Sequence, residues 1–125
     1  TYGLERICMF VQGKKNVFDI DWNDNGVKYG DVYLQSEKEF SAYNFDQANT
    51  DSLLKNFEIA EQECKNLLDQ KLPLPAYDQC LKASHIFNLL DARGVIAVAE
   101  RTGYINRIRE LAKGAGSGWL ENQER

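Results

Sequence analysis

The spacing of apolar residues between positions 51 and 112 is the feature that most constrains the fold. Such spacing, at three and four residues, places apolar side chains on one face of a helix. We therefore predict three amphipathic helices that pack as an antiparallel bundle. The three stretches carry, in order, Leu53, Leu54, Phe57, Ala60, Cys64, Leu67 and Leu68; Ala76, Cys80, Ala83, Phe87 and Leu90; and Val95, Val98, Thr102, Ile105, Ile108 and Ala112.

Helix start and stop signals separate these stretches. Thr50 or Asp51 can cap the first helix, and Asp91 can cap the third. Pro75 suits the first position of the second helix, because its missing N–H costs nothing there. After Lys113 a glycine-rich run predicts a frayed tail.

The first part of the chain follows other patterns. Leu4–Val11 predicts a helix that Gly13 ends. Residues 16–34 are rich in β-prone side chains around the turn signal Asn23–Gly26, which predicts a small β hairpin or irregular β excursion.

A short helix is predicted over residues 37–44, because Ser36 and Glu39 match a capping box. The change in pattern places a domain boundary between residues 1–48 and 49–125. The expected fold class is therefore mainly α, with a small β element before the bundle.

Charge and composition exclude several classes of function. The net charge is −4, which argues against a protein that grips nucleic acid through bulk charge. No apolar run is long enough to cross a bilayer, and no signal peptide is visible. The only basic surface expected lies on the third helix, where the bases could face tRNA or could simply be solvated. Those bases are Arg93, Arg101, Arg107, Arg109 and Lys113.

The residue types that usually bind metals or transfer protons are sparse. The three cysteines are far apart and are expected to be buried small side chains in a reducing compartment, so no structural metal site is predicted. The acids between Asp19 and Asp31 do not match a calcium loop. His85 is expected to be a packed histidine rather than a general base, although its role stays open.

The sequence TYGLER, at residues 1–6, offers more specific chemistry. Gly3 would let a nucleotide approach the backbone. Arg6, at the start of a helix, could bind polyphosphate with its forked donors, and Glu5 could accept from an amine or help to hold Mg²⁺. The alternative is an ordinary first helical turn, with Glu5 placed near the positive helix end.

TYGLERICMF resembles the third sequence motif of class II aminoacyl-tRNA synthetases. The rest of the chain is similar to the α subunit of bacterial heterotetrameric glycyl-tRNA synthetases. Three runs carry the resemblance: YGDVYLQSEKEFSAYNFDQA at 29–48, LPLPAYDQCLKASHIFNLLDARGVIAVAERTGYI at 72–105 and NRIRELAK at 106–113.

The resemblance implies a C-terminal part of a catalytic α subunit, whose class II core is an antiparallel sheet. That subunit would activate glycine with ATP and Mg²⁺ and transfer glycyl to tRNA(Gly), in the cytoplasm, as an α–α dimer joined to β subunits. It also implies that Arg6, Gly3 and Glu5 bind ATP, with Arg6 on the γ-phosphate side. We expect the segment by itself to be inactive. The alternative function is a non-catalytic helical module that binds tRNA or the β subunit.

Overall fold

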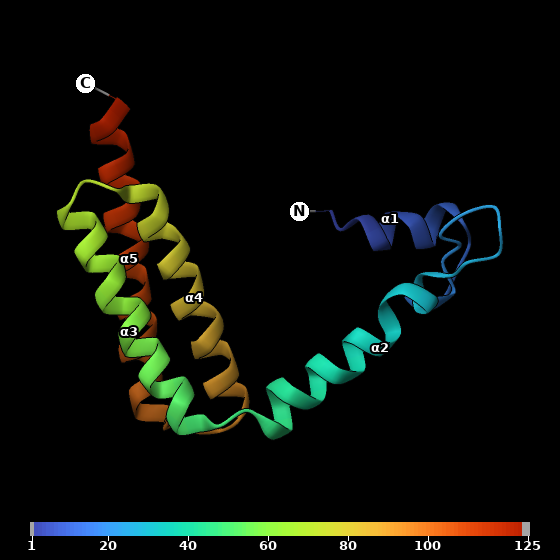
Figure 1. Cartoon of the computed structure of the whole chain (residues 1–125), viewed down its shortest axis with the longest axis horizontal. Helices are drawn as coiled ribbons and strands as arrows, with labels where there is room; N and C mark the ends of the chain where they lie inside the picture. Colours follow the sequence, from blue (N-terminus) through green and yellow to red (C-terminus); the bar gives the residue numbers. More distant parts are fainter. Residues whose placement is uncertain (1, 124–125) are drawn as a thin grey trace. The chain divides into compact units, whose positions relative to one another are not determined.

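The computed structural model describes residues 2–123, which are mainly helical (Figure 1). Two compact units divide between Asp46 and Gln47, two residues before the predicted domain boundary. Within the described residues there is no strand, and no helix is long and apolar enough to span a membrane. The helical segments are α1 Leu4–Val11, η1 Val17–Asp19, α2 Tyr29–Ala42, η2 Tyr43–Gln47, α3 Thr50–Asp69, α4 Pro73–Ala92 and α5 Val98–Gln123.

The second unit is the predicted three-helix bundle, in which α3, α4 and α5 lie side by side (Figure 1). The first two predicted stripes are confirmed, since all their members are buried in the core or packed against it. The third stripe is partly wrong: Val98 is 91% exposed, and Val95, Thr102 and Ala112 are exposed as well, because α5 begins only at Val98 and turns a different face to the core. The side of α5 that faces the core instead carries Tyr104, Ile105, Ile108, Leu111 and Ala115.

Three of the predicted helix starts are displaced. The side chain of Asn49 caps α3, accepting from the N–H of Ser52 at 2.8 Å, so neither Thr50 nor Asp51 is the cap. Pro73, two residues before Pro75, begins α4.

Asp91 belongs to the last turn of α4 and does not cap α5. Its carboxylate accepts instead from Nε of Arg101, at 3.2 and 3.1 Å.

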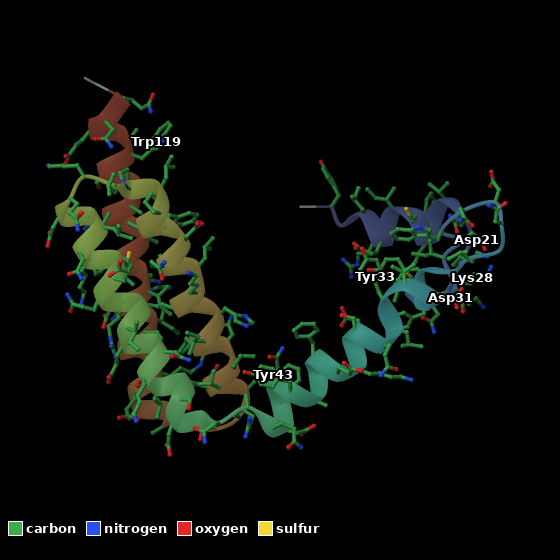
Figure 2. The ribbon with its side chains drawn as sticks, viewed as in Figure 1. Asp21, Lys28, Asp31, Tyr33, Tyr43 and Trp119 are labelled. Carbon is green, nitrogen blue, oxygen red and sulfur yellow. The ribbon has the colours of Figure 1, made fainter. Side chains whose placement is uncertain are left out.

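The frayed tail predicted after Lys113 is wrong, because α5 continues as a helix to Gln123. Its glycines permit close packing against the rest of the bundle. A Cβ at Gly114 would lie 2.8 Å from Leu68 Cδ1, and one at Gly118 would lie 3.4 Å from Pro73 Cβ. Tertiary contact therefore offsets the low helix propensity of glycine here. Trp119, labelled in Figure 2, lines a hollow together with Pro73, Leu74 and Tyr77 at the start of α4.

In the first unit α1 has the predicted bounds, whereas the described residues form no strand in the predicted β region. The turn at Asn23–Gly26 forms, but only one isolated bridge flanks it, between Asp21 and Lys28. From Tyr29 the chain is already helical, and the predicted capping residue Ser36 lies inside α2.

The β-prone stretch contains an N-terminal helix signal, and its β-prone residues hid that signal from the sequence prediction. The carboxylate of Asp31 accepts from the N–H of Lys28 at 2.8 Å, which fixes the first turn of α2. One turn apart on that helix, the rings of Tyr29 and Tyr33 pack with their centroids at 4.8 Å.

Candidate functional site

The residues predicted to bind ATP lie at the first turn of α1. Gly3 is the N-cap residue and has φ +78°, a backbone conformation that glycine adopts without strain. Its carbonyl accepts from the N–H of Ile7 at 3.2 Å. Arg6 is exposed, and no salt bridge among the described residues involves it. Its guanidinium is therefore available for an anion.

The side chain of Glu5 is directed towards α2 rather than towards the predicted ATP site. The hydroxyl of Tyr29 donates to Glu5 Oε1 at 3.4 Å. Partial burial raises the pKa of Tyr29, and the nearby carboxylate of Glu5 raises it further, so Tyr29 stays a donor.

An open cavity of about 520 Å³ lies between α1 and α2 and has Glu5 on its wall. Three aromatic rings form one side: Trp22 packs edge-on to Tyr33 at 5.7 Å, and Tyr33 packs against Tyr29. The other lining residues are Leu4, Cys8, Ile20, Asp21 and Glu37. Cys8 is exposed, so the expectation of three buried cysteines holds only for Cys64 and Cys80.

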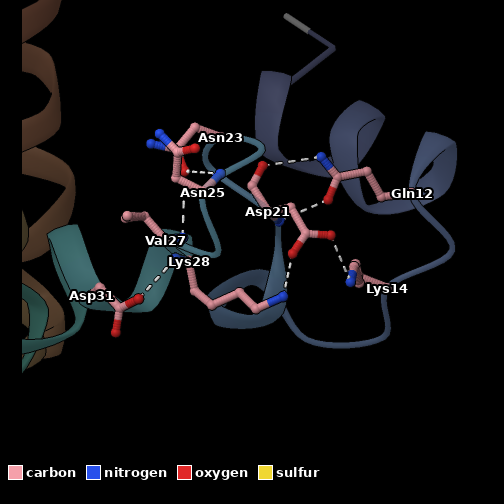
Figure 3. A network of polar contacts seen from close by, with 8 residues as sticks. All are labelled: Gln12, Lys14, Asp21, Asn23, Asn25, Val27, Lys28 and Asp31. Atoms are coloured by element: carbon pink, nitrogen blue, oxygen red, sulfur yellow. Dashed lines mark hydrogen bonds and ion pairs between the residues drawn. The ribbon is translucent and has the colours of Figure 1, made fainter.

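A polar network, drawn in Figure 3, joins the end of α1 to the start of α2. The side-chain amide of Gln12 bonds the main chain of Asp21 twice, accepting from its N–H at 2.7 Å and donating to its C=O at 3.1 Å. The carboxylate of Asp21 pairs with Lys28 and, at 2.9 Å, with Lys14. These two ammonium groups lower the pKa of Asp21, and Asp21 in turn raises the pKa of Lys28.

The side chain of Asn23, the first residue of the turn inside this network, closes the turn. Asn23 Oδ1 accepts from the N–H of Asn25 at 3.0 Å and from that of Val27 at 3.4 Å. The N–H of Trp22 donates to the carbonyl of Val27 at 2.8 Å. Asp21 and Lys28 are thereby brought opposite each other.

The bases predicted to face tRNA fall into two groups. Three bond within the bundle: Arg93 donates to the carbonyl of Ala48 at 2.9 Å, Arg101 binds Asp91, and Arg107 binds Glu61. Arg109 and Lys113 are exposed one turn apart on α5, and no salt bridge in residues 2–123 involves either.

His85 and the groups that could bind a metal offer little chemistry. His85 is exposed on α4, so the expectation of a packed histidine is wrong. Among the described residues, no group of three or more His, Cys, Asp or Glu side chains is arranged to hold a metal ion.

Sequence reasoning missed Gln12 and Tyr29. The sequence did contain a signal for Tyr29: a tight turn at Asn23–Gly26 pairs the residues before it with those after it, and Tyr29 is one of the latter. Gln12 gave no signal, since its partner is a main chain nine residues away.

The chain matches one family model over nearly its whole length. The model describes the glycyl-tRNA synthetase alpha subunit and covers residues 1–124. The chain therefore belongs to the glycyl-tRNA synthetase alpha subunit family, and its role lies in glycyl-tRNA synthesis as part of an aminoacyl-tRNA ligase.

Proposed function

We propose that this chain contributes Arg6 to an ATP-dependent, class II site that activates glycine and then charges tRNA(Gly). The substrates are glycine and ATP with Mg²⁺. The working assembly is a cytoplasmic heterotetramer in which paired α subunits bind β subunits. The observation that carries the proposal is the exposed guanidinium of Arg6 in the turn that follows Gly3.

In the activation step, a glycine carboxylate oxygen attacks the α-phosphorus of ATP. A new P–O bond forms to give glycyl-adenylate, and the bond to the β-phosphate breaks to release pyrophosphate. Negative charge grows on the leaving pyrophosphate, so the step needs fixed positive charge there more than a proton-transferring side chain. The permanently charged, forked guanidinium of Arg6 suits that role on the γ-phosphate side.

Gly3 and Glu5 serve this role indirectly. Gly3 allows the chain to turn into α1 at positive φ, with no Cβ beside the aliphatic part of Arg6. Glu5 accepts from Tyr29 at 3.4 Å, and this bond directs its carboxylate towards α2. We therefore assign Glu5 to the support of the site more than to direct contact with ATP.

A substitution of Arg6 tests the proposal. In the complete α subunit assembled with its β partner, Arg6→Ala should slow glycine-dependent ATP–pyrophosphate exchange by tens to hundreds of fold, from the loss of about 2–4 kcal/mol. Arg6→Lys should recover part of the rate, because a single ammonium keeps the charge but not the fork. Lys15→Ala, which removes an exposed base in the same unit, is the matched control. Near-normal exchange by Arg6→Ala would refute the assignment.

The alternative function is tRNA contact through the helical unit, and two residues remain as candidates for that contact. Arg109 and Lys113 lie on one side of α5, whereas the other three candidate bases bond to groups of the bundle itself. We propose that any direct phosphate contact by this unit uses this pair. A unit that contacts only the β subunit would instead bind tRNA no differently when both charges are removed.

A further inference from the structure

The position of α1 within its unit depends on polar contacts at its two ends, which we call tethers. Within the described part of the chain, α1 buries none of its residues, and Phe10 is 88% exposed. The helix has only eight residues, and an isolated helix of that length is unstable in water. Among the described residues, the side-chain hydrogen bonds that join α1 and Gln12 to the rest of the unit are made with Asp21 and Tyr29.

One tether lies at the C-terminal end of α1. Gln12, which follows the last helical residue, bonds both the N–H and the C=O of Asp21 (Figure 3). Because both partners are main-chain groups, the amide fixes the distance and the direction of the segment that it meets. Asn carries the same amide on a side chain one methylene shorter, and no charged side chain can both donate and accept in this way.

The second tether lies at the other end of α1, where Tyr29 donates to Glu5. The two tethers are joined, since the N–H of Tyr29 donates to the carbonyl of Ile20 at 2.8 Å. The helix, the segment at Ile20 and Asp21, and Tyr29 thus form a closed ring of contacts. Opening the ring at Gln12 would leave the ion pair between Lys14 and Asp21 as the remaining side-chain link at this end of α1, so the helix would be held less firmly there and could pivot about Glu5.

We infer that Gln12 is a positioning residue that holds Arg6 in the orientation needed for ATP activation. The inference rests on the proposed role of Arg6. Gln12 and Arg6 lie six residues apart, roughly 9 Å along a helix axis, so Gln12 acts through the helix and touches no substrate. A displacement of about 1 Å at a reacting group can slow a step by as much as ~100-fold.

Two substitutions of Gln12 test the inference in the complete enzyme, by glycine-dependent ATP–pyrophosphate exchange. Gln12→Ala, which loses both bonds, should lower kcat/KM for ATP by about 10-fold. Gln12→Glu should lie between it and wild type, because a carboxylate still accepts from the N–H of Asp21 but cannot donate to its carbonyl. Gln35→Ala is the matched control: it removes an amide bonded to Glu39 on the exposed surface of α2, and it should leave the rate unchanged.

The double variant Arg6→Ala/Gln12→Ala separates positioning from general damage. If Gln12 acts through Arg6, then Gln12→Ala should change the rate of the Arg6→Ala enzyme by less than about 2-fold. A full second loss, or a normal rate for both single variants of Gln12, would overturn the inference while leaving the role of Arg6 intact. A normal rate for Arg6→Ala alone would instead refute the proposed function itself.

Discussion

The guanidinium of Arg107 on α5 donates two hydrogen bonds to the carboxylate of Glu61 on α3, at 3.0 Å from Nε and 2.6 Å from Nη2. The same guanidinium lies over the ring of Phe57, 4.6 Å from its centre, and beside the ring of Tyr104. Glu61 is the one buried charged residue among those described, with 9% of its surface exposed. The pair therefore links the first and third helices of the bundle where apolar packing alone would leave the rotation of α5 less defined.

Removal of this pair should destabilise the bundle. Arg107→Ala leaves the Glu61 carboxylate with Lys65 as its remaining cation, at 3.3 Å. Because 38% of the Arg107 side chain is exposed, solvent screening lowers the loss below that of a fully buried pair, to about 1–3 kcal/mol. Urea denaturation measures it. Arg109→Ala, on the exposed side of the same helix, should stay within about 0.5 kcal/mol of wild type. Equal effects of the two variants would contradict this account.

The same pair should make stability depend on acid pH. Its bond to Arg107 holds the pKa of Glu61 below its ordinary 4.5, although burial opposes the shift. With a lowered folded-state pKa, the stabilisation is complete above that ordinary value and is lost as the pH falls through the lowered one.

Glu61→Gln carries no titrating carboxyl at this position, so its free energy of unfolding should fall less steeply than that of wild type between roughly pH 5 and pH 3. The gap between the two proteins should therefore narrow towards acid, as measured by thermal or urea denaturation at each pH. A gap that stays constant with pH would show that the pair does not shift this titration.

Two glycines of α5 should respond differently to alanine. Nothing lies within 4 Å of a Cβ built at Gly116, so Gly116→Ala should stabilise the helix by up to ~1 kcal/mol. At Gly114 the new methyl would overlap the side chain of Leu68 on α3, so Gly114→Ala should be less stable than Gly116→Ala by about 1 kcal/mol or more. Equal stability of the two variants would mean that α3 and α5 are not closely packed at this level.

Arg109 and Lys113 should carry any phosphate contact made by the bundle. The double variant Arg109→Ala/Lys113→Ala should weaken binding of tRNA(Gly) and reduce the slope of log K against log salt by about 1 per lost contact, between about 50 and 200 mM salt. Arg101→Ala is the control, because that guanidinium is bonded to Asp91. An unchanged slope in the double variant would favour contact with the β subunit alone.

The family resemblance and the first two helical stripes could be read directly from the chain. In α3 and α4 the apolar side chains recur with one period over about four turns, so a single helix face is the only arrangement that buries them all. The eight-residue helix at Leu4–Val11 was equally legible, because Gly13 ends it.

The start of α2 inside a β-prone run has local causes: Asp31 caps Lys28, and Tyr29 packs on Tyr33 one turn away. Tertiary structure decided the rest, because those choices depend on partners far away in sequence. The glycines after Lys113 stayed helical because they let α5 approach Leu68 and Pro73. Arg107 is paired with a carboxylate 46 residues away in the sequence. Only the folded structure therefore distinguishes this structural base from the free guanidinium of Arg6. Local propensity sets the order of the helices, and long-range contact determines where they end and which charges remain free for a ligand.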